Sequence, residues 1–213
     1  MIYSNEENGP SYIRVNRPFS QARIFEFLRR IEESEYKTID KKTMGVLVNL
    51  VYHCALKEKE ALALKIKNVR DKDGQVKVEI KLEGRSVPIQ ASMQPVLNEY
   101  FEYLGEKGYG QKDPLFPGRK SLGRPVEPYH SRKLQRDIRM VDKNFPRYLN
   151  VIDKIRQTRI CEFYEAEAAS GKSPAQCLRS TAQFAGISER HAIGILTDRI
   201  TNRVRGIGYT YAR

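Results

Sequence analysis

Residues 46–67 read VLVNLVYHCALKEKEALALKIK and form a dense run of apolar residues. The first part predicts a buried helix, which breaks at Ala55-Leu56-Lys57. A second helix follows, which Glu58, Lys59 and Glu60 open and in which Ala61, Leu62 and Leu64 are apolar. An apolar run this short and this interrupted by charge does not predict a membrane span. It predicts the buried centre of one domain.

The residues after this run predict a β-hairpin. A turn at 71–74 precedes an alternating strand at 75–82, QVKVEIKL, and a second strand at 85–89, RSVPI. The two strands are joined by Glu83-Gly84, and glycine tolerates the positive φ that such a tight turn requires.

Helices are predicted on both sides of the hairpin. Ser20 is a suitable N-cap for a helix at 21–34, and apolar residues at helical spacing continue the pattern at 93–104. Further helices are predicted from near Ser131, over 150–169, and from Ser173-Pro174 onward. The fold class is therefore mainly α with a small antiparallel β-hairpin (α+β). We expect an N-terminal arm at 1–18, one domain at 19–200 and a basic C-terminal tail at 201–213.

Charge and cysteine usage narrow the class of function. Lys and Arg number 38 against 26 Asp and Glu, a formal net charge of +12, which favours a polyanionic partner. Cys54, Cys161 and Cys177 lack the spacing that metal sites require, so we expect no metal, no cofactor, and reduced core cysteines in a cytoplasmic protein. The polar, acidic N-terminus is unlike a signal peptide.

The order of these elements resembles the catalytic domain of the tyrosine recombinases, or phage integrases. The buried helix, the Ala-Leu-Lys break, the Glu-rich helix start and the hairpin ending in Val-Pro-Ile occur in the family's order. PLFPGR at 114–119 resembles its loop before the middle helices, and IRQT at 155–158 resembles its second signature box. The likeness extends over roughly residues 19–200. It implies a tyrosine recombinase catalytic-domain-like fold, here without the separate N-terminal DNA-clamping domain.

The resemblance also implies a chemistry that can be checked residue by residue. In the family a tyrosine hydroxyl attacks a phosphodiester, two arginines bind the non-bridging oxygens, and a lysine and histidines assist proton transfer. In this sequence Lys57 stands at the first arginine position, Lys81 near the lysine position and Arg156 at the second arginine position. This set is vestigial, because an ammonium group cannot fork across two phosphate oxygens.

The remaining family positions depart further from that pattern. Asp153 replaces a histidine and repels phosphate, Ile187 replaces the third-box donor, and Leu196 stands where the nucleophile is expected. Tyr209 and Tyr211, in the tail, are the candidates for a relocated nucleophile.

Basic residues between 119 and 139 lie on a loop and a helix face and can contact successive phosphates. The expected DNA-binding residues are Lys57, Lys81, Arg119, Lys120, Arg124, Arg132, Lys133, Arg136, Arg156, Arg159 and Arg190, with Arg139 in the same basic stretch.

The sequence therefore favours a double-stranded DNA-binding protein of a mobile element, phage or plasmid that has lost strand cleavage. Its expected partners are DNA and, through the tail, itself or a catalytic recombinase, with no membrane. Three alternatives stay open. The first is an active recombinase that uses Tyr209 or Tyr211. The second is a regulator whose helix-turn-helix at 182–196 reads bases through Ser188, Glu189, Arg190 and His191. The third is an RNA-binding protein, which the absence of tryptophan disfavours.

Overall fold

A computed structural model describes residues 18–36, 40–118, 125–145 and 149–197. The first part of the chain forms α2 (Gln21–Glu33), α3 (Lys41–Cys54), α4 (Glu58–Ala63), α5 (Ile66–Val69), β1 (Glu79–Leu82) and β2 (Arg85–Pro88). The second part forms the 3-10 turn η1 (Ala91–Met93), α6 (Gln94–Glu106), α7 (Ser131–Val141), α8 (Val151–Ala169) and α9 (Pro174–Ala185). A further helix begins at 189 and reaches 197. The predicted α+β class with one small hairpin is confirmed.

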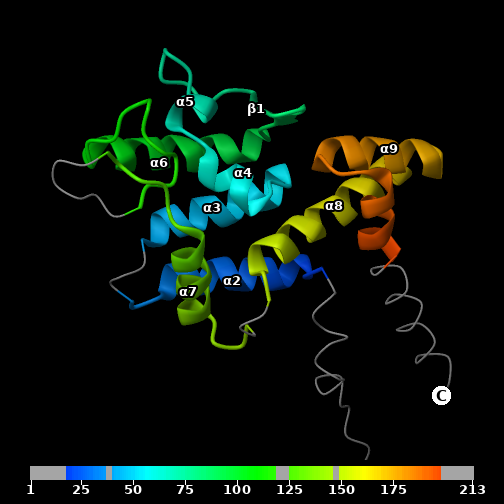
Figure 1. Cartoon of the computed structure of the whole chain (residues 1–213), viewed down its shortest axis with the longest axis horizontal. Coiled ribbons are helices and arrows are strands. Elements are labelled where there is room, and N and C mark those ends of the chain that lie inside the picture. The colour runs from blue at the N-terminus through cyan, green and yellow to red at the C-terminus, as the bar shows by residue number, and fades with distance from the viewer. Residues whose placement is uncertain (1–17, 37–39, 119–124, 146–148, 198–213) are drawn as a thin grey trace, which may run out of the picture.

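Helix α3 is the centre of the main hydrophobic core. Asp40 caps it by accepting a hydrogen bond from the Thr43 amide at 3.0 Å, and its second half is apolar on nearly every face. A helix that is hydrophobic all round must be covered on all sides. Helices α2, α6 and α8 pack around it (Figure 1). The prediction of a buried central helix is confirmed, and no described helix is long and apolar enough to cross a bilayer.

The predicted break after α3 is a left-handed turn at Ala55, with φ +48°. A left-handed residue stops the helix and turns its carbonyl away from the helix axis. Lys57 then becomes the N-cap of α4, and the Glu60 carboxylate accepts a hydrogen bond from the Lys57 amide at 2.7 Å. The turn therefore places the Ala55 carbonyl and the Lys57 side chain beside α8.

The first predicted strand is shorter than its alternating pattern indicated. Only Glu79–Leu82 pairs with β2, in the register Ile80 with Val87, while Val76 bridges to Arg70 instead. The Lys77 amide donates to Val69 O, so this part of the chain pairs with the end of α5, although the Val78 carbonyl still accepts from the Ile89 amide at 2.8 Å. The Val78 side chain is 76% exposed. Gly84, at φ +74°, makes the predicted tight turn.

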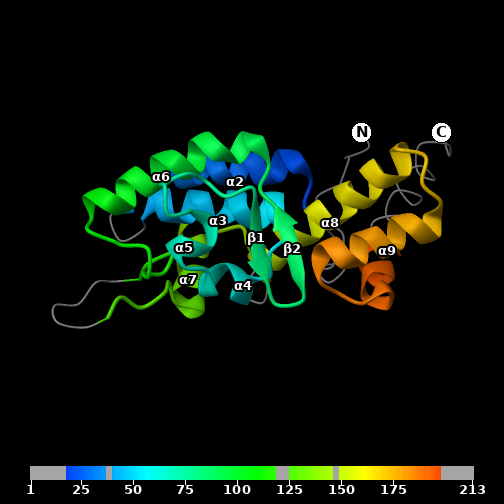
Figure 2. The ribbon, with the colours of Figure 1, turned by 90° about the horizontal axis from the view of Figure 1, so that it is seen from above.

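Helices α8 and α9 form an antiparallel pair at one end of the molecule, and α9 lies along the outer half of α8 (Figure 2). A second, smaller apolar cluster joins this pair to the body and to the helix at 189–197. Its buried members are Ala55, Ile160, Cys161, Ala185, Ile195 and Leu196. The three cysteines are free and buried, as predicted for core residues.

The core assignment predicts unequal effects for two valine substitutions. Val48 in α3 is fully buried and Val78 is 76% exposed. We expect Val48→Ala to lower the free energy of unfolding by about 2 kcal/mol, because it removes buried methyl groups and leaves a cavity. Val78→Ala removes the same atoms from an exposed site, and we expect a change below about 0.5 kcal/mol. Urea unfolding of both variants would measure this, and equal losses would contradict the assignment.

Candidate nucleic-acid interface

Two residues of the predicted vestigial set meet at one place, although 98 positions separate them in the sequence. Lys57 caps α4, Arg156 lies in the second turn of α8, and both reach the turn that ends α9. The Lys57 Nζ donates to Gly186 O at 2.8 Å, and the Arg156 Nη2 donates to Ala185 O at 2.9 Å. The alignment of Ala185-Gly186 with the third signature box is consistent with this contact, because the fold brings that turn to Arg156.

Arg156 is directed at backbone carbonyls rather than at open solvent. Its side chain is 4% exposed, its Nε donates to Ala55 O at 3.0 Å, and its Nη1 lies 3.6 Å from Asp153 Oδ1. Burial is the main cause that lowers the pKa of the guanidinium, and the neighbouring charge of Asp153 opposes that shift. These three contacts engage all three nitrogens of the guanidinium and leave little of the fork for a phosphate in this conformation.

Arg85, the first residue of β2, was not predicted as a site residue. Its side chain is 4% exposed; Nη1 donates to Phe184 O, and Nη2 lies 2.7 Å from Glu60 Oε2 and 3.5 Å from Ala55 O. The sequence around Arg85 did not indicate a site residue, because only the packing of β2 on α9 brings this side chain to the end of α9. We refer to Lys57, Arg85 and Arg156 as the cation cluster.

The cation cluster donates hydrogen bonds to the carbonyls at the C-terminal end of α9. The last carbonyls of a helix have no partner within the helix and carry partial negative charge. Phe184 O, Ala185 O and Gly186 O accept from Arg85, Arg156 and Lys57 in that order. Gly186 has φ +61°, and an added Cβ would lie 2.6 Å from the Arg85 Nε, so both the turn and the arginine require glycine there. Three elements of the body thus hold the C-terminus of α9.

The other family positions lie around the cluster without completing its chemistry. Asp153 is 44% exposed, and its carboxylate also accepts from Gln157 Nε2 at 2.7 Å. Leu196, at the nucleophile position, is buried in the second apolar cluster. Lys81 is 86% exposed on β1, with only Glu79 nearby at 4.0 Å. Tyr209 and Tyr211 lie outside the described residues.

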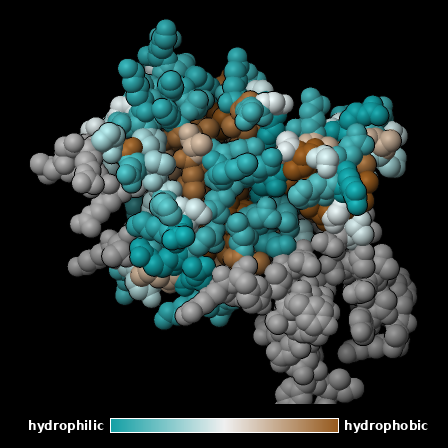
Figure 3. Space-filling view, in the orientation of Figure 1, coloured by the Kyte–Doolittle hydropathy of each residue, from teal (hydrophilic) through white to brown (hydrophobic). Residues whose placement is uncertain are grey.

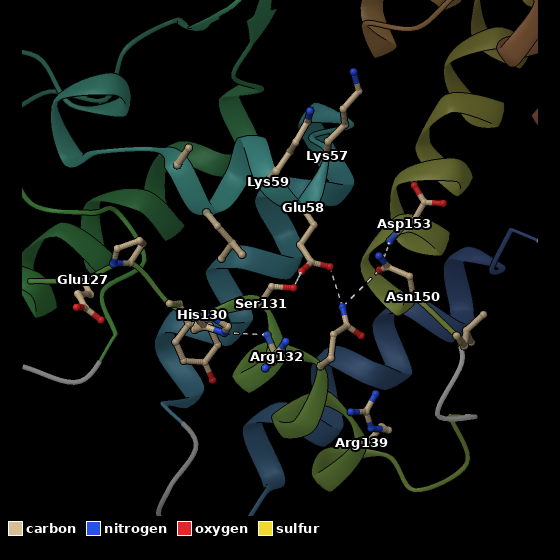
Figure 4. A pocket seen from close by; sticks show the side chains of 16 residues that line it. Lys57, Glu58, Lys59, Glu127, His130, Ser131, Arg132, Arg139, Asn150 and Asp153 are labelled. Carbon is tan, nitrogen blue, oxygen red and sulfur yellow. Dashed lines mark hydrogen bonds between the residues drawn. The ribbon is translucent and has the colours of Figure 1, made fainter.

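A surface groove of about 1060 Å³ begins at Lys57 and runs between α4 and the first turns of α7 and α8 (Figure 4). Its basic lining residues are Lys57, Lys59, His130, Arg132 and Arg139, and its acidic ones are Glu58, Glu127 and Asp153. Hydrophilic residues cover most of the face that Figure 3 shows, in the orientation of Figure 1, with only small hydrophobic patches between them. Apolar side chains such as Leu62 and Leu149 line the groove together with these charged ones, and the many charged residues distinguish it from a mostly apolar small-molecule pocket.

Helix α7 carries four basic residues that were expected to bind DNA. Arg132 and Arg139 line the groove. Lys133 and Arg136 contact the fully buried carboxylate of Asp137, Arg136 at 3.3 Å, although the Arg136 side chain is 62% exposed and lies one turn from Arg132 on the same face. Tyr129 also donates its hydroxyl to Asp137, and burial raises the pKa of that phenol. The sequence analysis expected all four basic residues to contact DNA and did not foresee that Asp137 pairs with two of them.

Polar side chains form the floor of the groove between α4 and α7. Glu58 accepts from the Ser131 hydroxyl and from Gln135 Nε2, the latter at 2.8 Å, and Gln135 also lies 3.4 Å from Asn150 Oδ1 (Figure 4). The sequence analysis did not predict Lys59 or these four residues as site residues, because charged and polar residues are common on helix surfaces.

The remaining predicted contacts lie elsewhere. Arg159 is 22% exposed and lies 3.7 Å from Glu162, on the part of α8 beyond the groove. Arg190 and His191 are exposed on the helix at 189–197, whereas Ser188 accepts from the His191 amide at 3.2 Å and so caps that helix. Arg119, Lys120 and Arg124 lie outside the described residues.

The buried position of Arg156 makes its loss costly. We expect Arg156→Met to lower the free energy of unfolding by about 3 kcal/mol, because it leaves two buried carbonyls without their charged donor. Arg156→Lys keeps the charge but cannot reach both carbonyls, so it should also destabilise the fold. Denaturant unfolding would measure both, with the exposed Arg132→Met as the matched control. A loss no larger than that of the control would show that the carbonyl contacts contribute little.

The chain matches several solved structures. No protein-family model matches it, and no curated protein does. XerH site-specific recombinase bound to palindromic difH substrate, a post-cleavage complex, matches with a TM-score of 0.65 and 18% identity, over 97% of this chain and 56% of that one. XerA recombinase matches with a TM-score of 0.60 and 14% identity, over 97% and 69%.

The integrase of transposon Tn1549, in complex with circular intermediate DNA, matches with a TM-score of 0.54 and 13% identity, over 90% and 62% of the two chains. The chain spans about half the length of the two XerH chains. All of these proteins are tyrosine recombinases, and identities this low establish the fold alone. The helices packed around α3 and the small hairpin thus belong to one architecture: this chain has the fold of the tyrosine recombinases.

Proposed function

We propose that this protein binds double-stranded DNA through the groove between α4, α7 and α8, and does not cleave it. One observation carries the proposal: the cations at the family's catalytic positions hold the end of α9, while other cations line an open groove beside them. Lys57 and Arg156 donate to Gly186 O and Ala185 O, and Lys59, Arg132 and Arg139 have no part in that contact.

The chemistry of strand cleavage supports the second half of the proposal. A phosphoryl transition state needs donors preorganised around the non-bridging oxygens and a nucleophile within reach. Here Asp153 adds negative charge next to Arg156, and the side chain at position 196 is a buried leucine without a hydroxyl. Both features oppose attack on a phosphodiester.

The distribution of charge supports the DNA-binding half of the proposal. The net charge of +12 favours any polyanion, and the groove places cations from α4 and α7 along one channel. XerH and the Tn1549 integrase are in complex with DNA in the matching structures. By analogy with them, we place this protein in DNA recombination, as an accessory factor of a mobile element that occupies a site or regulates a catalytic recombinase. Contact with such a partner through the tail at 201–213 is part of the same proposal.

DNA affinity should depend on the groove face of α7. We expect the protein to bind random-sequence duplex DNA with a steep salt dependence. Arg132→Ala and Arg139→Ala should each weaken binding and reduce the slope of log K against log salt by about 1, because each removes a phosphate contact. Arg29→Ala removes the same charge from an exposed site on α2, which does not line the groove, and should leave the slope unchanged. Fluorescence anisotropy at several salt concentrations measures this, and an absence of binding at low salt would overturn the proposal.

A second candidate function, an active recombinase, is favoured by the convergence of Lys57 and Arg156. A pool of nicked duplexes that traps 3′-phosphotyrosine adducts separates the two functions. We expect no covalent adduct, whereas a catalytic tyrosine recombinase on its own nicked site should form one under the same conditions. An adduct that disappears in Tyr209→Phe or Tyr211→Phe would establish the active enzyme instead.

A further inference from the structure

The cation cluster contains a buried donor without a partner. Among the described residues, the Arg85 Nε is buried and has no hydrogen-bond acceptor, although both terminal nitrogens of the same guanidinium are bonded. A buried donor without an acceptor is destabilising by about 1–3 kcal/mol. The guanidinium of Arg85 can therefore donate one more hydrogen bond than the surrounding acceptors take up.

The cluster also carries more positive than negative charge. Among the residues that the structure describes, the carboxylates that pair with Lys57, Arg85 and Arg156 are those of Glu60 and Asp153. Arg85 and Arg156 share the Ala55 carbonyl as an acceptor, and the charge of Arg85 is one of the causes that lower the pKa of Arg156. Two guanidinium groups this close repel each other unless an anion lies between them. Helix-end carbonyls supply only a partial negative charge.

The groove leads to this cluster. Lys57 lines the groove with part of its side chain, which is 35% exposed, while its Nζ contacts Gly186 O. Asp153 lines the groove and contacts Arg156. Lys57 is thus the member of the cation cluster that lines the groove, and Asp153 connects the groove to Arg156.

We propose that Arg85 supplies the second phosphate-binding guanidinium that position 57 lacks, and that the C-terminal carbonyls of α9 hold this site closed until a backbone phosphate of DNA displaces them. The inference rests on the proposed DNA-binding function. A phosphate carries a full negative charge, so its hydrogen bonds to these cations join two charged partners, whereas a carbonyl brings only a partial charge. The phosphate therefore competes with Phe184 O, Ala185 O and Gly186 O for the same donors.

Displacement has a consequence for the end of the molecule. Once the three carbonyls lose their donors, the turn after α9 keeps its own bonds, such as that from the Ile187 amide to Ala182 O at 3.0 Å, and the apolar contacts of Ala185 and Ile187. DNA binding would then loosen this turn and the helix at 189–197 that follows it. The cation cluster thus links DNA in the groove to the anchoring of α9.

Hydrogen exchange tests this link directly in the full chain. With saturating random-sequence duplex, we expect the amides of Gly186 and Ile187 to exchange about tenfold faster than in the free protein, because local opening becomes easier. Unchanged or slower exchange at these amides, with DNA bound, would overturn the proposal and leave the DNA-binding function intact.

Variants of Arg85 test the phosphate contact itself. Arg85→Met should weaken DNA binding about tenfold and reduce the salt slope by about 1. Arg85→Lys keeps the charge without the fork and should recover the slope but only part of the affinity. Arg70→Met is the matched control, since Arg70 also donates to a carbonyl, Gly74 O at 2.9 Å, and stacks on Phe101 away from the groove. If Arg85→Met lowers thermal stability but binds DNA like Arg70→Met, the cluster is only a clamp and the proposal is wrong.

Failure of the DNA-binding function is distinguishable from failure of this inference. If the wild type binds no duplex at low salt, inorganic phosphate replaces DNA as the probe. A rise in Tm with phosphate, relative to chloride at equal ionic strength, that is absent in Arg85→Met would support the site. An equal response of both proteins would overturn it.

Discussion

The end of α9 is held by three cations that come from three different parts of the chain. A helix C-terminus buried against a protein body needs donors for its last carbonyls, and here α4, β2 and α8 supply one each. The left-handed turn at Ala55 makes this possible, because it adds a fourth carbonyl to the cluster and starts α4 at Lys57. The second apolar cluster lies against the same turn, so the polar and apolar contacts of α9 depend on one another.

This arrangement places stability and phosphate chemistry in competition. A guanidinium that satisfies buried carbonyls is desolvated and directed inward, whereas a phosphate-binding arginine needs its fork turned toward the ligand. In the described conformation Arg85 and Arg156 are each 4% exposed. The C-terminal end of a helix carries a partial negative charge, so the same cations can bond either to the carbonyls of α9 or to a phosphate. The balance between the two partners decides whether the cluster acts as a clamp or as a site.

The groove beside the cluster follows from how α7 distributes its charge. Asp137 is fully buried, so its carboxylate requires nearby cations, and Lys133 and Arg136 pair with it. Arg132 and Arg139 line the groove with Lys59. One buried carboxylate thus engages two of the four basic residues of the helix, and the other two keep their charge at the groove.

The sequence by itself determined the helices, the hairpin and the order of elements that identifies the fold, because periodicity and turn residues act locally. The central helix, its break at Ala55, the caps at Ser20, Asn150 and Ser173, and the glycine turns all follow from residues close in sequence. The assignment of Lys57 and Arg156 to the two arginine positions also came from the sequence, because the motifs around them occur in the order of the family. Tertiary structure alone decided what these residues contact. Arg85 joined the site because β2 packs on α9, Lys133 and Arg136 contact a buried carboxylate, and the start of the predicted first strand pairs with the end of α5 because the Lys77 amide bonds to Val69 O. The contact of Lys57 with Gly186 joins residues 129 positions apart, and no local pattern encodes which donor meets which acceptor.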